Sequence, residues 1–252
     1  MFYNPQEWCP YSQASPRIAS QSTVYLRLYY VIDSSTPAEY ATWPVYCDAC
    51  TSDVVEVEPS VKIGLISDIH ADPKALRRVL ADMPSIDRLW CAGDAVSEYQ
   101  FCAETVQVLL EARAECIQGN HERVLFGGAN RRYLSKCQAE FGAPILEVLA
   151  TAPTTHAVEV DGARLLMVHA SPWKPFEEYI FPGSPRLPHF AQLPYDFVIL
   201  GHTHVAMLQH ADRVTIVNPG SCSQPRDQDP RGSYAVLDTA QRTVDLRRVR
   251  LD

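Results

Sequence analysis

The 252-residue sequence lacks the features of several classes of protein. No apolar stretch approaches the roughly 20 residues that span a bilayer, and the most apolar N-terminal segment, TVYLRLYYVI, is short and contains Arg27. The start of the sequence has neither the basic opening nor the apolar core of a signal peptide. We therefore expect a cytoplasmic protein that has no membrane partner.

The sequence also lacks an excess of positive charge. Its formal net charge is −8, and it contains no run of Lys and Arg. Because nucleic acids and anionic lipids are bound through basic surfaces, this balance argues against a nucleic-acid polymer as a partner. A small phosphate ligand would need local cations.

Cysteine patterns typical of metal sites are nearly absent. Cys47 and Cys50 form one CxxC pair, but no second pair follows, and the first 60 residues contain no histidine. A cysteine-rich zinc site is therefore not expected. Several of the eight cysteines lie in apolar runs such as LWCAGD, where a free cysteine behaves as a small hydrophobic residue.

The organisation of the sequence changes near residue 60. Residues 1–60 mix Ser, Thr, Pro and aromatic residues without a sustained period and favour at most one strand, at 23–33. We interpret residues 1–60 as an N-terminal extension of unknown role, with disorder of part of it left open. Residues 61–252 form the main predicted domain, since a chain with 46% hydrophobic residues can bury a full core.

The sequence after residue 60 alternates between strand and helix patterns. An apolar run precedes Asp68, and Asp72 with Pro73 then supplies a helix N-cap and a first-turn proline. Further apolar runs at 87–93 and 114–119 flank a second helical pattern, so the order predicts a βαβαβ beginning with parallel strands. Later runs predict a second, partly antiparallel sheet; they lie at 156–160, 164–169, 196–200, 205–210, 213–217, 233–238 and 242–249.

Five of the apolar runs end in side chains of the kinds that bind metals. These residues are Asp68 and His70, Asp94, Asn120 and His121, His169, and His202 and His204. Residues two apart in an extended segment share a face, so Asp68 and His70 should project together. Because open α/β sheets bind ligands at the carboxyl ends of their strands, we expect the five strand ends to converge.

This set of side chains indicates which ions would bind. It is too large for one ordinary zinc ion, which takes four ligands, but it suits two cations that share a carboxylate. Imidazoles with carboxylates and an amide oxygen, without thiolates, suit Mn, Fe, Zn, Co or Ni. Two such ions neutralise a phosphate group and lower the pKa of a bridging water, which is what phosphoester hydrolysis requires.

The order of these motifs resembles the calcineurin-like metallophosphoesterases, specifically their small bacterial and archaeal phosphodiesterase-like branch. The matching motifs are DIH at 68–70, GD at 93–94, GNHE at 119–122, the lone His169, GHTH at 201–204 and the closing stretch NPGSCSQPRDQDPRGSYAVLD. The resemblance covers residues 61 to about 250. It implies an α/β fold, a four-layer αββα sandwich of two mixed β-sheets flanked by helices, with a binuclear metal site at one end.

The resemblance also implies roles for single residues. One ion would be held by Asp68, His70 and His204, the other by Asn120, His169 and His202, with Asp94 as the catalytic bridge. A hydroxide that bridges the ions would attack phosphorus, and His121 would protonate the leaving oxygen. Asn120, His121 and Arg226 are the candidate substrate contacts. The expected cofactors are two divalent transition metal ions (Mn, Fe, Zn, Ni or Co), with manganese favoured.

Two loops depart from the pattern of this branch. HAD and GDAVSEYQ replace the glycine-containing loops that are common there, and fewer glycines make loops stiffer. Ser97, Glu98 and Tyr99 stand where protein serine/threonine phosphatases carry the Asp and Arg of GDxVDRG. This argues against a protein phosphatase and leaves Glu98 as a weak candidate for the partner that orients His121.

The predicted function is a metal-dependent phosphoric ester hydrolase, and within that class a phosphodiesterase that acts on a small, nucleotide-like phosphoester. The open alternatives are a phosphomonoesterase, a dinucleoside polyphosphate hydrolase, and a non-catalytic scaffold with the same fold; a homo-oligomer is also open. The complete ligand set favours the enzyme. The aromatic residues of SPWKPFEEYIF either stack a nucleobase as a lid or belong to the core or a dimer surface.

Overall fold

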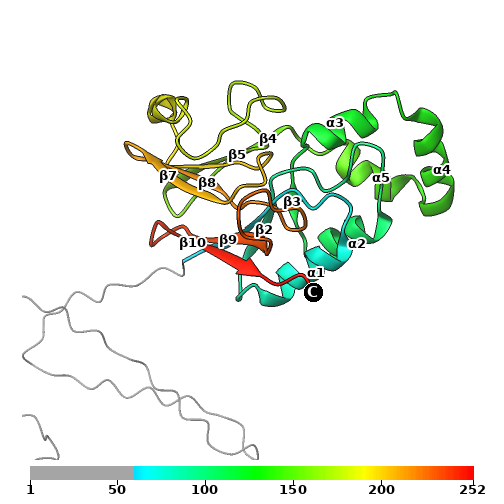
Figure 1. The fold of residues 1–252 in the computed structure, drawn as a ribbon, viewed down its shortest axis with the longest axis horizontal. Helices are drawn as coiled ribbons and strands as arrows, with labels where there is room; N and C mark the ends of the chain where they lie inside the picture. Colours follow the sequence, from blue (N-terminus) through cyan, green and yellow to red (C-terminus); the bar gives the residue numbers. More distant parts are fainter. Residues whose placement is uncertain (1–59) are drawn as a thin grey trace, which may run out of the picture. The chain divides into compact units, whose positions relative to one another are not determined.

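The computed structural model describes residues 60–252, which form two β-sheets with α-helices grouped together beside them (Figure 1). The predicted N-terminal extension, its strand at 23–33 and the Cys47–Cys50 pair lie outside the described residues. Among residues 60–252, no helix combines the length and the apolar character needed to cross a membrane.

The first sheet has the strand order β10-β9-β1-β2-β3. Its strands are β1 (Lys62–Ile66), β2 (Arg88–Cys91), β3 (Glu115–Cys116), β9 (Gly232–Asp238) and β10 (Thr243–Val249). As predicted, β1, β2 and β3 pair in parallel, and α1 (Pro73–Asp82) and α2 (Ala103–Glu111) connect them. The predicted cap is also present, since the Asp72 carboxylate accepts the N–H groups of Lys74 and Ala75.

The assignment of 233–238 and 242–249 to the second sheet was wrong. These segments form β9 and β10 of the first sheet, where β9 runs antiparallel to β1 and Leu65 lies opposite Ala235. The residues that pair are far apart in the sequence. A local apolar pattern predicts that a strand exists, but it does not specify which distant strand will be its neighbour.

The second sheet has the strand order β4-β5-β6-β8-β7. Its strands are β4 (Thr155–Val160), β5 (Ala163–Val168), β6 (Phe197–Ile199), β7 (Met207–Ala211) and β8 (Val214–Asn218). The central strands β5, β6 and β8 are parallel, and the edge strands β4 and β7 are antiparallel to their neighbours. Leu65 and Trp90 of the first sheet pack with Leu165 and Phe197 of the second in one apolar cluster between the sheets.

Helices and one loop segment form the outer layers. Leu76 of α1 and Leu109 of α2 share an apolar cluster with Ile66 of β1, so these helices cover the first sheet. The second sheet is covered by the 3₁₀ helix η1 (Leu187–Gln192) and the segment before it. The four-layer α/β sandwich is thus confirmed, with a short 3₁₀ helix and loop as the fourth layer.

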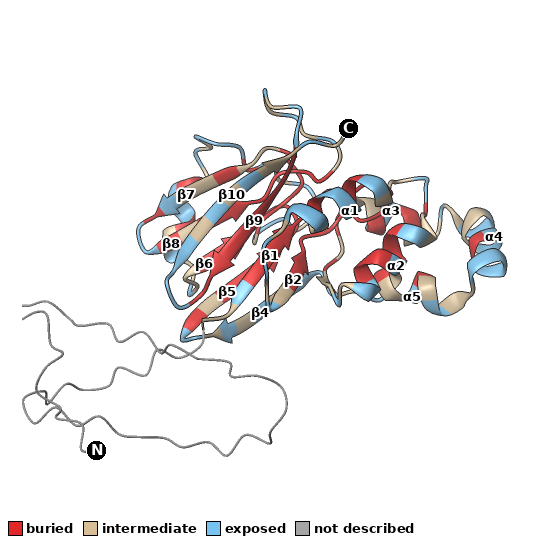
Figure 2. Cartoon of the chain, turned by 90° about the horizontal axis from the view of Figure 1, so that it is seen from below, coloured by how far each residue is buried: buried red, intermediate tan, exposed pale blue. Residues whose placement is uncertain are grey.

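Three further helices were not predicted from the sequence. They are α3 (Asn120–Phe126), α4 (Arg131–Phe141) and α5 (Ala143–Ala150). In α4 only Cys137 is buried, and Figure 2 shows this helix largely exposed while buried residues follow the strands. Its core-packed apolar residues Tyr133, Leu134 and Cys137 are few among charged and polar neighbours, so the helix was not recognised from the sequence.

Candidate metal centre

The predicted metal ligands lie at the carboxyl ends of strands from both sheets. Asp68 and His70 follow β1, Asp94 follows β2, Asn120 follows β3, His169 follows β5, and His202 and His204 follow β6. All except Asn120 are buried. Buried polar groups need partners, and these side chains find them mainly in one another.

Asp68, His70 and His204 form the first cluster. The Nε2 atoms of His70 and His204 are 3.0 Å apart, and Asp68 Oδ1 is 3.8 Å from the first and 3.4 Å from the second. Atoms that each bind one ion at about 2.0–2.2 Å stand about 3–3.5 Å from one another, so two of these spacings fit a common ion and the third is slightly longer. Asp68 Oδ1 is buried and has no hydrogen-bond partner among residues 60–252, which suits a cation at this position.

Asn120, His169 and His202 form the second cluster. Asn120 Oδ1 is 3.0 Å from His169 Nε2 and 2.8 Å from His202 Nδ1. His169 Nδ1 lies 2.7 Å from the carbonyl oxygen of Ala92. A proton on Nδ1 donates to this carbonyl and leaves Nε2 with a free electron pair, as in most metal-binding histidines. The amide oxygen and the two imidazoles therefore fit a second ion.

Asp94 lies between the two clusters. Its carboxylate lies within 4.8 Å of nitrogen atoms of His70 and His121 in one group and of His169 and His202 in another. Burial opposes its negative charge, but His169, His121 and the backbone N–H of His121 hold the pKa of Asp94 well below its usual range. An ionised carboxylate in contact with both groups has the position expected of a bridge.

Burial sets the charge of the other side chains. It raises the pKa of Asp68 to about 7, and it lowers the pKa of His70 to about 3 and those of His202 and His204 to about 4. Neutral imidazoles have the electron pair that a metal requires, whereas a buried carboxylate needs a compensating cation. His169 differs: burial again favours its neutral form, but Asp94 raises its pKa to about 10, so Nε2 must lose a proton when an ion binds.

The backbone is strained at this edge of the molecule. Positive φ angles occur at five predicted ligands, namely Asp68 (53°), His70 (50°), Asp94 (55°), His202 (68°) and His204 (59°). Residues other than glycine rarely adopt this left-handed conformation, and such strain concentrates at functional sites. The sharp turns allow one short loop to supply two ligands.

Two glycines allow the loops to approach one another. A Cβ atom at Gly119 would collide with the Asp94 carboxylate, and one at Gly201 would collide with the Ser67 hydroxyl. The GNHE and GHTH motifs therefore begin with glycine because the backbone at this position lies against a neighbouring loop that carries candidate ligands.

Glu122 is a supporting residue that the sequence analysis missed. Its carboxylate is fully buried and accepts the N–H groups of Asp94 (2.9 Å), Val96 (3.0 Å) and Gly119 (2.8 Å). It therefore ties the loop after β2 to the loop after β3. The signal was present, since an acidic residue in the third helical position is typical of a capping box.

Residues 218–221, in the closing stretch of the sequence, also hold these loops. Asn218 Nδ2 donates to the carbonyl of Gly201 at 2.6 Å, and Ser221 Oγ donates to the carbonyl of Asp68 at 2.6 Å. The closing stretch of the sequence thus connects the loops after β6 and β1.

His121 lies at the edge of the centre, in the first turn of α3. Its Nε2 is 3.8 Å from Asp94 Oδ2, its side chain is 22% exposed, and its ring packs edge-on against His70. Within residues 60–252, no group hydrogen-bonds its buried Nδ1. Glu98, the weak candidate from the sequence, therefore does not hydrogen-bond this nitrogen, and the suggestion that it orients His121 was wrong.

Arg226, the predicted phosphate contact, is close to two of the candidate ligands. Its backbone N–H donates to the carbonyl of His204 at 3.1 Å, and its side chain is exposed. Burial lowers the pKa values of His202 and His204, and the positive charge of Arg226 lowers them further. The guanidinium therefore contributes positive potential at this side of the centre.

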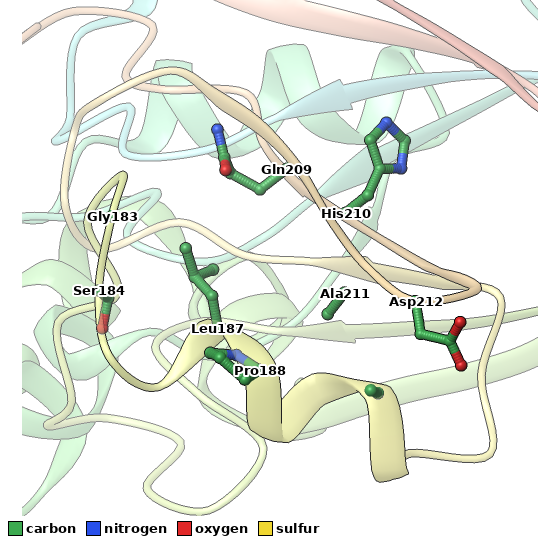
Figure 3. A pocket seen from close by; sticks show the side chains of 9 residues that line it. Gly183, Ser184, Leu187, Pro188, Gln209, His210, Ala211 and Asp212 are labelled. Carbon is green, nitrogen blue, oxygen red and sulfur yellow. The ribbon is translucent and has the colours of Figure 1, made fainter.

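A separate cavity of about 460 Å³ lies between η1 and β7. Figure 3 shows Leu187 and Pro188 of the 3₁₀ helix on one side and Gln209 and His210 of the strand on the other. None of the predicted site residues lines it, so it is not part of the metal centre.

Two mixed sheets in a sandwich, with paired clusters of carboxylate, amide and imidazole groups at their strand ends, define a metal-dependent hydrolase. A sequence model of the calcineurin-like phosphoesterase superfamily domain matches residues 61–242, and the chain belongs to that superfamily. The resemblance found in the sequence is thereby confirmed, as is the class of enzyme, a hydrolase of phosphoric esters.

The chain is similar to several prokaryotic proteins. It is 26% identical to the phosphodiesterase YfcE of Escherichia coli K12 over 180 residues, which are 71% of this chain and 88% of that protein. It is 25% identical to a probable metallophosphoesterase of Methanothermobacter thermautotrophicus, over 67% of this chain and 81% of that protein. A metallophosphoesterase from Sphaerobacter thermophilus has a crystal structure that resembles this one with a TM-score of 0.64. The sequence identity is 29%, and the match covers 76% of this chain and 88% of that chain.

Proposed function

We propose that this protein is a phosphodiesterase that hydrolyses a small, nucleotide-like phosphoester with two divalent transition metal ions. The observation that carries the proposal is the pair of clusters with Asp94 between them, grouped with His70 on one side and with His169 and His202 on the other. One ion is assigned to Asp68, His70 and His204, and the other to Asn120, His169 and His202. The donors suit Mn, Fe, Co, Ni and Zn, and manganese is the ion that we favour.

Side chains of the protein bind the phosphate and donate the proton. When bound, two such ions neutralise the phosphate and supply a hydroxide nucleophile. His121 donates a proton from Nε2 to the leaving oxygen, a role that suits an imidazole at the exposed edge of the centre. Asn120 and Arg226 bind phosphate oxygens. Burial of the other candidate ligands keeps bulk water away from the reacting group.

The proposed enzyme has a small substrate, a cytoplasmic location and a single phosphoesterase domain. The net charge of −8 and the lack of basic runs favour a small substrate over a nucleic-acid polymer or a membrane surface. The proposed location of the enzyme is the cytoplasm. Residues 61–252 form the phosphoesterase domain, and residues 1–60 are an extension that supplies no ligand. The remaining alternatives within the class are a phosphomonoesterase and a dinucleoside polyphosphate hydrolase.

The test is a set of variants of the metal-reconstituted protein assayed on mono- and diesters, cyclic nucleotides and dinucleoside polyphosphates. His121→Ala should lower the rate by a factor of about 10²–10⁴ while both metals stay bound, because the variant loses only a proton donor. The loss should be smaller for nitrophenol leaving groups, which need less protonation. His169→Ala should lose metal as well as activity.

His210→Ala is the matched control, since His210 is exposed on β7 and lies outside the centre; it should keep both metals and full rate. An emptied metal site in His121→Ala, or an equal penalty for every leaving group, would contradict the proton-donor role. A metal-loaded protein that hydrolyses only monoesters would contradict the phosphodiesterase assignment.

A further inference from the structure

The aromatic residues that follow His169 separate into two groups, and the first group serves packing. The ring of Trp173 packs edge-on against Phe190, with ring centroids 4.9 Å apart, and Arg186 lies 5.0 Å from the Trp173 ring. Arg123 lies 4.8 Å from the ring of Phe176. These contacts account for half of the cluster.

The second group, Tyr179 and Phe181, is exposed beside the metal centre. The two side chains are 50% and 44% exposed. The Tyr179 ring stacks on the ring of His202, with centroids 4.0 Å apart and planes 28° apart. The Phe181 ring is nearly parallel to that of Tyr179, at 7° and 5.9 Å. At this separation parallel rings are offset, so each keeps an open surface.

The segment that carries these rings is held in place. Ile180, between the two aromatic residues, is 1% exposed and belongs to the apolar cluster on the outer face of the second sheet. The preceding Glu178 accepts from Ser171 Oγ at 2.6 Å and from Arg186 Nε at 2.7 Å. These contacts indicate that Tyr179 and Phe181 form a fixed platform, in contrast to the lid considered from the sequence.

The exposed area is too small to favour a protein partner. Two half-exposed aromatic side chains offer roughly 200 Å², whereas a stable protein interface buries about 800 Å² on each partner. A single planar ring needs far less area. Because the stacked rings begin at His202, a candidate ligand, a planar group joined to a phosphate through a sugar would reach them from the metal centre.

We propose that Tyr179 and Phe181 are specificity-determining residues that stack the nucleobase of a nucleoside phosphoester whose phosphate lies at the metal centre. This inference rests on the proposed phosphodiesterase function and names its substrate class. Every nucleobase has a planar π-face, so stacking of this kind selects for the presence of a base and tolerates its identity. Arg226, whose charge acts on His202 and His204, supplies positive charge for the phosphate.

The experiment compares two phosphodiesters that differ only in the base: the methyl esters of adenosine 5′-monophosphate and of ribose 5-phosphate. The metal-loaded enzyme should favour the adenosine ester in kcat/KM by about tenfold or more, since stacking on an aromatic side chain has effects of that size. Phe181→Leu should reduce this preference, and the double variant Tyr179→Leu/Phe181→Leu should abolish it.

Two controls make the comparison specific. Tyr179→Phe keeps the ring and should keep the preference. Phe141→Leu removes another exposed aromatic side chain, at the end of α4 and 41% exposed, whose ring pairs with Phe101 and not with Tyr179 or Phe181, and should also keep it. An equal kcat/KM for the two esters in the wild type, or an undiminished preference in the double variant, would overturn the proposal.

A titration with free adenosine and free ribose, followed by ligand-observed NMR, tests the platform without turnover. Adenosine should bind to the wild type and at least fivefold more weakly to the double variant, and ribose should bind to neither. If neither ester is hydrolysed, the phosphodiesterase function fails, while the titration still decides the platform. Equal adenosine binding by both proteins would refute the platform alone.

Discussion

Replacement of Glu122 by alanine tests whether one buried carboxylate aligns the metal-binding loops. In the structure this carboxylate accepts the N–H groups of Asp94, Val96 and Gly119, and it has no exposed surface. Alanine leaves these three donors without a partner in the protein. The loops after β2 and β3 then lose their shared attachment.

The magnitude follows from two opposing effects. Three buried donors without partners cost roughly 3–9 kcal/mol in total. The substitution also removes a buried carboxylate whose pKa is raised to about 7, by burial and by Asp94, and this recovers about 3 kcal/mol at pH 8. We therefore expect Glu122→Ala to lower the free energy of unfolding by about 3 kcal/mol.

Urea unfolding of the metal-free protein at pH 8 measures this loss, and elemental analysis after reconstitution measures the bound metal. Glu140→Ala, which removes an exposed carboxylate from α4, is the control and should change neither quantity. Glu122→Gln keeps one acceptor oxygen and should lie between the two. If Glu122→Ala loses less than about 1 kcal/mol and keeps both metals, other contacts align the loops and our reasoning is wrong.

Three further predictions concern the same centre. Asp94→Asn should remove most metal and activity together, because it weakens a carboxylate that lies against histidines of both clusters; full retention of two ions by elemental analysis would contradict the bridge. Gly119→Ala should lower metal affinity by displacing the Asp94 carboxylate, whereas Gly183→Ala, whose added Cβ meets open space, should leave it unchanged even though Gly183, unlike Gly119, has a positive φ. Deletion of residues 1–58 should leave metal content and turnover nearly intact, since every candidate ligand lies beyond residue 61; a folded but inactive product would show that the extension contributes to the site.

The positions of the candidate ligands could be predicted because they depend on a simple rule. Each one ends or closely follows an apolar run, and parallel strands bring their carboxyl ends to one edge. The structure accordingly places Asp68, His70 and His204 in one cluster and His169 with His202 in another. The rule needs only the order of elements along the chain.

The features that escaped prediction depend on distant partners. The position of β9 beside β1 is set by pairing across most of the domain, and no local period contains that information. Glu122 was missed because its role lies in accepting N–H groups from a loop 26–28 residues away. The role suggested for Glu98 failed for the same reason, since a position in a motif does not determine which nitrogen of His121 has a neighbour.

The division of the candidate ligands between the sheets has a consequence for biosynthesis. Asp68 and His70 are made early and His204 late, and Asn120 likewise precedes its companion His202 by 82 residues. A nascent chain on the ribosome therefore has neither proposed ion site complete until residue 202 has emerged, and the first site also needs residue 204. Ions taken up before that point would be held by fewer ligands and exchange readily. Stable metal loading is thus expected only late in synthesis, in chains whose two sheets have already docked.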